Sequence, residues 1–224
     1  MGFTWQWDYM FEVLPRLLGA TGNTLLAAIG GYAIAVVIGL VFALGQRTPF
    51  WLVNRIVREC VEFIRSTPLL LQIFFVFFVG PQFGIFLSPW VAGLLAIGVH
   101  YGSYLSEVYR AGLESVPKGQ WEAAKALNLS TWRTYTRIII PQSLPPSVPA
   151  MGNYLVSIFK DTPMLSAIGV PELVLRATEV GSEVYRFLEP FTLVGIIFLV
   201  ISLVAAAGVR KFEQKVRRAM GLSQ

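Results

Sequence analysis

Four residues that can exchange protons or hydrogen bonds recur at helical spacing near the middle of the chain. His100, Ser103, Tyr104 and Glu107 stand at i, i+3, i+4 and i+7, so a helix would place all four on one face. They lie in an otherwise apolar stretch, where an ionisable side chain needs protein or water around it. The stripe predicts either interhelical hydrogen bonds or the lining of a path for a polar solute, and the sequence leaves both open.

A second polar stripe lies further along the chain. Asn153, Ser157, then Lys160 or Asp161, share a helix face with Met164. Two such stripes on neighbouring helices would describe a route for a polar solute, although Lys160 and Asp161 could simply pair with each other near the outer surface. The residues proposed for this path are Thr67, Gln72, His100, Ser103, Tyr104, Glu107, Asn153, Ser157, Lys160 and Asp161.

Catalytic chemistry has little support in the sequence. The chain has one cysteine, Cys60, and one histidine, which are too few for an internal disulfide or a zinc site. It has no glycine-rich phosphate loop of the Walker type and no cluster of nucleophile and base. We therefore expect no catalytic residue, no metal site and no cofactor on this chain, and a membrane-bound enzyme is disfavoured.

The elements that carry these stripes are expected to cross a membrane. Of 224 residues, 55% are hydrophobic and 14% are charged, whereas soluble domains are roughly one quarter charged. A hydrocarbon layer of about 30 Å needs about 20 apolar residues. The predicted spans are 25–44, 69–79 with its flanks, 90–105, 147–168 and 191–209. Several prolines precede the fourth of these spans. This pattern predicts an all-α membrane protein with a single domain over 1–224 and no cleaved signal peptide.

Basic residues predict how the five spans are oriented. Segments 47–65, 110–137 and 210–218 hold 14 of the 18 Lys and Arg residues, and five spans place all three segments on one side. That side is the cytoplasm by the positive-inside rule, so we expect the N-terminus outside and the C-terminus inside. The net charge of +5 then reflects topology, and no nucleic-acid partner is expected.

The cytoplasmic segment 116–137 between the third and fourth spans is charged and amphipathic. Lys118 and Gly119 are expected to break helical structure in the chain, and residues 120–127 after them favour a helix. Asn128 tolerates the left-handed conformation that commonly ends a helix, and Ser130 can cap a second helix that begins at Thr131.

This segment has two possible environments. An amphipathic element could lie on the lipid surface. Its small residues Ala123, Ala124 and Ala126 favour a face that docks on another protein instead.

The segment also carries a resemblance. The order Glu-Ala-Ala, three residues, a turn residue and later Pro141 resembles the EAA signature of the membrane subunits of ATP-binding-cassette (ABC) importers, with Asn128 where that family usually has Gly. The stretches "RSTPLLLQ", "YLSEVYRAGLESVPKGQWEAAKAL" and "IIIPQSLPPSVPAMGNYLVSIFKDTP" are similar to the polar amino-acid permease branch. Within it, "HYGSYLSEVYRAG", "KALNLS", "KDTPMLSAIGV" with Pro163, and "GSEVYRFLEPFTLVG" resemble ectoine and hydroxyectoine permeases.

The resemblance implies a type I ABC importer permease fold with five spans and a cytoplasmic coupling helix. The implied coupling residues are Gly119, Glu122, Ala123, Ala124, Leu127, Asn128 and Pro141. The implied partners are ABC ATPase subunits that carry ATP and Mg, a second permease subunit that is identical or homologous, and an external solute-binding protein that meets segment 169–189. The implied location is the bacterial inner membrane, among lipids.

Ectoine or hydroxyectoine is the expected solute, and a polar amino acid is the alternative. A different class, an ion-coupled secondary carrier with His100 and Glu107 as relay groups, is also possible. The lack of an inverted repeat argues against that class.

Overall fold

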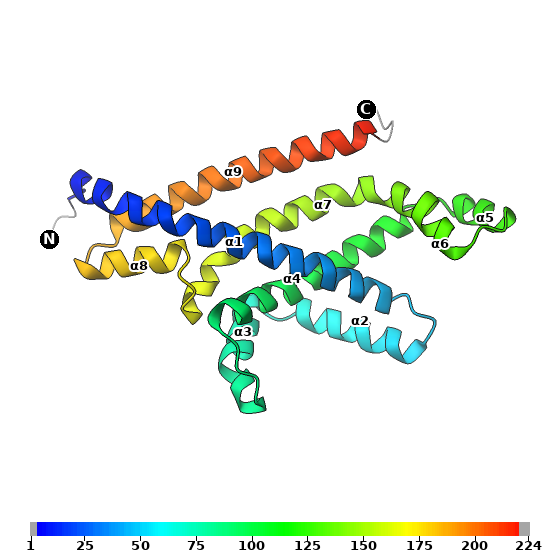
Figure 1. The fold of residues 1–224 in the computed structure, drawn as a ribbon, viewed down its shortest axis with the longest axis horizontal. Helices are drawn as coiled ribbons and strands as arrows, with labels where there is room; N and C mark the ends of the chain where they lie inside the picture. Colours follow the sequence, from blue (N-terminus) through cyan, green and yellow to red (C-terminus); the bar gives the residue numbers. More distant parts are fainter. Residues whose placement is uncertain (1–3, 220–224) are drawn as a thin grey trace.

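The computed structural model describes residues 4–219, and helices account for most of them (Figure 1). No β-strand occurs in this range, so the all-α prediction is confirmed there. The single domain predicted over 1–224 is therefore described except for residues 1–3 and 220–224. The helices are α1 (Trp7–Gly45), α2 (Trp51–Arg65), α3 (Leu69–Phe74), α4 (Pro89–Glu114), α5 (Lys118–Ala126), α6 (Thr131–Thr134), α7 (Ile140–Asp161), α8 (Leu173–Glu183) and α9 (Leu188–Ala219).

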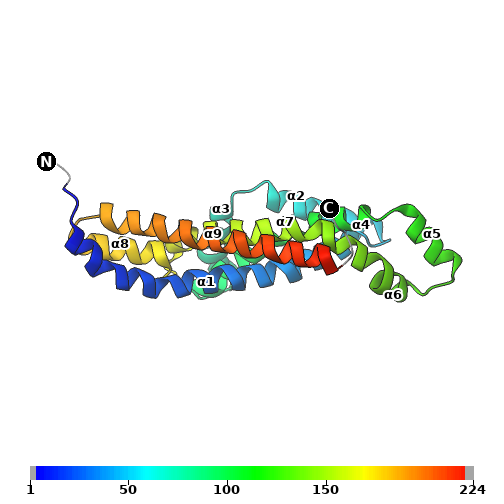
Figure 2. The ribbon, with the colours of Figure 1, turned by 90° about the horizontal axis from the view of Figure 1, so that it is seen from above.

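The long helices α1, α4, α7 and α9 run lengthwise through the molecule, and α3 projects from their side (Figure 1). The helices α5 and α6 extend beyond one end of this bundle, away from the end that holds α8 (Figure 2). The fold therefore presents two separate ends, joined by helices long enough to cross a membrane.

Close contact between α1 and α4 forms the centre of the core. A Cβ atom built on Gly39 would lie 2.9 Å from Leu105 Cβ and 3.0 Å from the backbone oxygen of Gly102. One built on Gly98 would lie 2.3 Å from Ile34 Cγ2. Small residues thus let the two backbones approach closely.

The second predicted span begins at a sharp bend in the chain. The helix α2 and the helical run Leu69–Phe83, which begins with α3, meet at an angle of 107° across residues 66–68. Pro68 lacks an N–H and disfavours helical geometry at the residue before it, so the chain breaks here. Beyond α3, the helical path continues as a π-helix, Phe75–Val79, and a 3₁₀ turn, Gly80–Phe83.

Two helices in the described part, α1 and α9, are long and apolar enough to cross a membrane. The bent pair of α2 and the helical run that begins at Leu69 would make a third span. The helices α4 and α7 carry the polar stripes, which lowers their hydropathy, while their packing against other helices provides protein surroundings for polar side chains. Five spans and the orientation of the termini stay predictions.

The helix α7 begins earlier than the predicted fourth span and contains its prolines. Pro145, Pro146 and Pro149 lie inside the helix, although each removes one backbone hydrogen bond. A π-helical turn, Tyr135–Ile139, precedes α7, and Pro141 follows this turn. Packing against α4 and α9 keeps the helix intact where propensity alone would end it.

The helix α8 packs between α1 and α9 at the end of the bundle opposite α5. Val13 and Leu17 of α1 are buried in one cluster with Leu173 of α8 and Val194 of α9. The Tyr9 hydroxyl also donates to the backbone oxygen of Val180 at 2.8 Å. This end of the molecule is therefore held together by the first and last long helices of the chain.

A buried carboxylate caps α8. Glu172 is fully buried, and its oxygens accept the backbone N–H groups of Val174 at 2.9 Å and Leu175 at 2.8 Å. Burial raises the pKa of Glu172 from 4.5 to about 7, and the two backbone hydrogen bonds only partly oppose this rise. Between these pH values the folded chain holds a proton that the unfolded chain has lost.

Folded stability should therefore fall as the pH rises from about 4.5 to about 7 and then level off. We expect a higher melting temperature at pH 5 than at pH 8 for the purified chain in detergent. Glu172→Gln should flatten this dependence, whereas Glu179→Gln, a change at an exposed carboxylate on the same helix, should keep it. An unchanged pH dependence in Glu172→Gln would contradict the assignment.

Candidate functional site

The 116–137 segment forms a compact pair of helices. The first helix, α5, already includes Lys118 and Gly119, so the predicted interruption at these residues is wrong; Pro117 fixes the helix start one residue before them. The helix ends at Ala126, and Asn128, two residues later, has the predicted left-handed conformation with a φ of 48°. The Asn128 N–H donates to the Lys125 oxygen at 3.0 Å and the Leu129 N–H to the Ala124 oxygen at 3.1 Å, which together form a Schellman motif.

The second helix of the segment starts as predicted. Ser130 caps α6 by accepting the Arg133 N–H at 3.4 Å. The rings of Trp121 and Tyr135 meet edge to face with centroids 5.4 Å apart, which joins α5 to the helical turn after α6. The stop, the cap and the ring contact together make this segment a rigid unit.

The exposed surface of this unit includes most of the proposed coupling residues. Gly119, Glu122, Ala123 and Asn128 are exposed, and Leu127 keeps 71% of its surface accessible. Trp132, which sequence reasoning did not select, is 77% exposed on the same unit. Two large apolar side chains held in solvent on a rigid element favour contact with another protein.

Two proposed coupling residues lie elsewhere. Ala124 is 1% exposed, so the expectation that it belongs to the docking face is wrong; its methyl group packs inside the unit because it follows Trp121 by one turn. Pro141 is exposed in the first turn of α7. Its neighbour Gln142 donates from Nε2 to Gln120 Oε1 at 3.3 Å, which links the start of α7 to α5.

The first polar stripe is part of a hydrogen-bonded network with the chain break before α3. The Gln72 amide donates to Thr67 Oγ1 at 2.7 Å and to the Ile64 oxygen at 2.7 Å. Its Oε1 lies 3.2 Å from His100 Nδ1, and His100 is buried. The structure therefore brings three proposed path residues, Thr67, Gln72 and His100, into one network.

Tyr104 and Glu107, toward the C-terminal end of the stripe, contact two arginines that sequence reasoning left out of the path. The guanidinium of Arg65 lies 5.2 Å from the Tyr104 ring centroid. Arg110 pairs with Glu107 at 2.7 Å, and Glu107 also accepts a hydrogen bond from Gln46 Nε2 at 3.2 Å. The i, i+3 spacing of Glu107 and Arg110 was a readable signal. Arg65 approaches Tyr104 because α2 packs against α4, a contact between distant parts of the chain that no local sequence signal indicated.

Two cavities meet at this charged group. One, of about 310 Å³, lies between α4 and α7 and includes Tyr104 and Tyr154. The other, of about 320 Å³, lies between α2 and α4 and includes Arg58 and Glu62. Arg65 and Glu107 line both cavities, so a small solute there would meet a cation and a carboxylate together.

The second stripe contacts α4 through Tyr101, a residue next to the first stripe but not part of it. Asp161 Oδ2 accepts a hydrogen bond from the Tyr101 hydroxyl at 2.5 Å, a contact that sequence reasoning missed. Asn153 and Lys160 are exposed, and Ser157 is half-buried. Ser103 is buried, and its hydroxyl donates within its own helix to the His100 oxygen at 2.5 Å. The two stripes therefore line one path only if a further element faces Asn153 and Lys160.

Comparisons with known proteins add to this geometry. The model of a family described as "Binding-protein-dependent transport system inner membrane component" matches residues 35–218. The probable amino-acid ABC transporter permease y4tG of Sinorhizobium fredii is 43% identical over 216 residues, which cover 93% of each chain. The glutamine transport system permease GlnP of Escherichia coli is 30% identical over 213 residues, 94% of this chain and 97% of the relative.

A solved structure shows the same fold. One chain of the structure described as an amino acid ABC transporter with histidines superposes with a TM-score of 0.88 at 29% identity, covering 95% of this chain and all of that chain.

Proposed function

Since the chain belongs to the family of binding-protein-dependent transport system inner membrane components and is the transmembrane subunit of an ABC importer, we propose that it carries a zwitterionic amino acid inward. The observation that best supports coupling to a partner is the rigid, exposed 116–137 unit beyond the end of the bundle. Rigid elements transmit a displacement, whereas flexible loops absorb it.

In this proposal, ABC ATPase subunits bind ATP and Mg and contact Glu122, Ala123, Leu127 and Trp132. Gly119 permits close approach because it presents no side chain. Asn128 ends α5 within the unit, and Pro141 lies in the first turn of α7, just after the unit. Movement of the unit passes to α4 and α7, which flank it in the chain and carry the polar stripes. This chain then contributes alternating access and no catalytic step.

Further partners follow from the same proposal. A second permease subunit, identical or homologous, would face Asn153 and Lys160 and complete the path. A solute-binding protein would meet segment 169–189 at the α8 end, where Arg16 and Glu183 form an exposed ion pair at 2.5 Å. The single domain over 1–224 would lie in a bacterial inner membrane.

The solute is proposed from charge. Arg65 suits a carboxylate, and an amino group would share the Glu107 carboxylate with Arg110; these are the two charges that a free amino acid carries. Two relatives are named for amino-acid or glutamine transport. Ectoine, to which the sequence motifs point, is also zwitterionic and is the competing solute. The ion-coupled carrier is disfavoured by the family and by the burial of His100 against Gln72.

Competitive uptake tests the solute. Cells that express the chain with its importer partners should take up labelled glutamine in an ATP-dependent manner, and unlabelled polar amino acids should compete while ectoine does not. Uptake of labelled ectoine that resists amino acids would reverse the assignment in favour of the compatible solute. Uptake that persists without the ATPase would contradict the importer proposal itself.

A further inference from the structure

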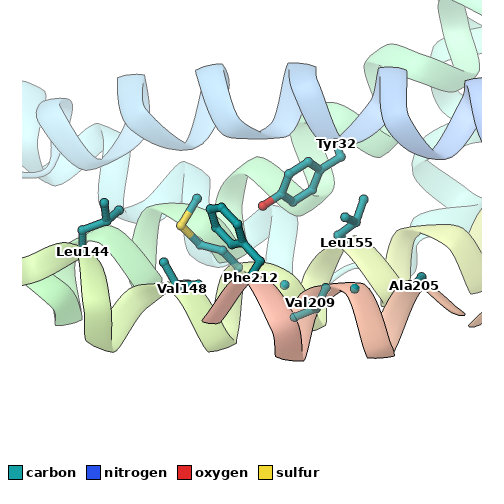
Figure 3. A pocket seen from close by; sticks show the side chains of 10 residues that line it. Tyr32, Leu144, Val148, Leu155, Ala205, Val209 and Phe212 are labelled. Atoms are coloured by element: carbon teal, nitrogen blue, oxygen red, sulfur yellow. The ribbon is translucent and has the colours of Figure 1, made fainter. Parts of the chain in front are cut away.

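A large apolar cavity lies apart from the polar path. It measures about 500 Å³ and lies between α1, α7 and α9 (Figure 3). Tyr32 of α1 points toward Phe212 of α9, and Leu144, Val148 and Leu155 close the α7 side. The cavity wall is almost wholly hydrocarbon, so it suits a chain of methylene groups and offers nothing to a charged solute.

The position of this cavity on α7 separates it from solute transport. Leu144, Val148 and Leu155 recur at i, i+4 and i+11, which places them on one face of α7. Asn153 stands on the opposite face, with the proposed path. The cavity therefore opens on the side of the helix that is turned away from the path.

Positive charge collects beyond one end of the cavity. Lys211 and Lys215 are exposed one turn apart on one face of α9, beside Phe212, and Arg137 precedes Leu144 along the chain. The carboxylate in this part of α9, Glu213, pairs with Arg217 at 3.1 Å. The end of the cavity is thus apolar inside and basic outside, a combination complementary to a lipid tail and an anionic headgroup.

We propose that this cavity binds one acyl chain of an anionic phospholipid, with the phosphate against Lys211 and Lys215. An empty apolar cavity loses dispersion contacts along its wall, and hydrocarbon is the material that a bilayer supplies. Basic residues beside a bilayer attract anionic headgroups and give the site its preference. The proposal depends on membrane location alone and stands if the transported solute is assigned differently.

Filling the cavity tests the proposal. Gly208 lines the cavity, and a Cβ atom built on it meets nothing within 4 Å, so Gly208→Leu should occupy the space without a clash. Gly195 of the same helix also has open space at Cβ but does not line the cavity, which makes Gly195→Leu the matched control. Both variants add the same apolar side chain to α9.

The experiment uses the full chain with its partners in nanodiscs of phosphatidylglycerol and phosphatidylethanolamine. Phosphatidylglycerol with a photoreactive acyl chain should label peptides from 144–155 and 205–212 in the wild type and in Gly195→Leu, and most of this label should disappear in Gly208→Leu. Lys211→Gln with Lys215→Gln should lower labelling by phosphatidylglycerol about three- to tenfold and leave that by phosphatidylethanolamine unchanged.

Other outcomes overturn the proposal. Equal labelling of Gly208→Leu and Gly195→Leu would show that the lipid lies outside the cavity. Equal labelling by the two lipids in the wild type would remove the role of the lysines. Absence of lipid label together with cross-links from 205–212 to a second permease chain would assign the cavity to a protein contact instead.

Discussion

Replacing Ala123 with Asp is expected to abolish ATP-dependent uptake while leaving the chain folded in the membrane. Ala123 is exposed on α5, so the new carboxylate is solvated until a partner covers it. Docking would then bury a charge without a counter-ion, and affinity for the ATPase should fall by about 2–5 kcal/mol. That loss corresponds to a factor of about 30 to several thousand. Copurification of the ATPase with the tagged permease, beside uptake, measures it.

Neighbouring positions separate docking from folding. Ala123→Ser keeps a small neutral side chain and should retain the ATPase. Ala124→Asp should also lose uptake, but through unfolding of the unit, because Ala124 is buried; proteolysis within 116–137 should then increase. Glu122→Lys provides a second change on the exposed face. Normal copurification of the ATPase with both Ala123→Asp and Glu122→Lys would remove the docking role.

Replacing Gly39 with Leu is expected to disrupt the core. The Cβ atom alone would approach the α4 backbone to 3.0 Å at the Gly102 oxygen, and a backbone cannot rotate away as a side chain can. The helices α1 and α4 would have to separate, which costs at least about 3 kcal/mol once several contacts are lost. The melting temperature of the purified chain and its yield in membranes measure this effect.

Gly22 supplies the matched control. It lies in the same helix, and a Cβ atom built on it meets nothing within 4 Å. Gly22→Leu should leave the melting temperature unchanged or raise it slightly, because leucine favours a helix over glycine. A melting temperature for Gly39→Leu equal to that for Gly22→Leu would show that close packing of α1 on α4 does not limit stability.

Features encoded over short distances could be predicted from the sequence. Asn128 and Ser130 each act through backbone groups within four residues, so their types and spacing specify the stop and the cap. The stripe on α4 likewise followed from helical periodicity. The prediction that Lys118 and Gly119 interrupt the helix was wrong for a reason that is also local. A glycine in the first turn of a helix costs little stability when a proline precedes that turn.

Features that depend on distant contacts could not be predicted. Arg65 reaches Tyr104 only because α2 packs against α4, and Tyr101 reaches Asp161 only because α4 and α7 pack together. The prolines of α7 have low helix propensity, and tertiary packing overrides it. Ala124 was assigned to the wrong side because small residues suit both a packed core and a docking face.

The cluster that joins α1, α8 and α9 has a consequence for biosynthesis. Val13 and Leu17 leave the ribosome first, yet one of their packing partners, Val194, is made near the end of translation. Until then the N-terminal part of α1 lacks the packing that α9 supplies, and the part of its apolar face left uncovered is open to chaperones and membrane proteases. A product that stops before α9 covers this face only in part, through α8. Synthesis of α9 therefore distinguishes a complete chain from a truncated one. Truncated permeases should be degraded before they can recruit an ATPase.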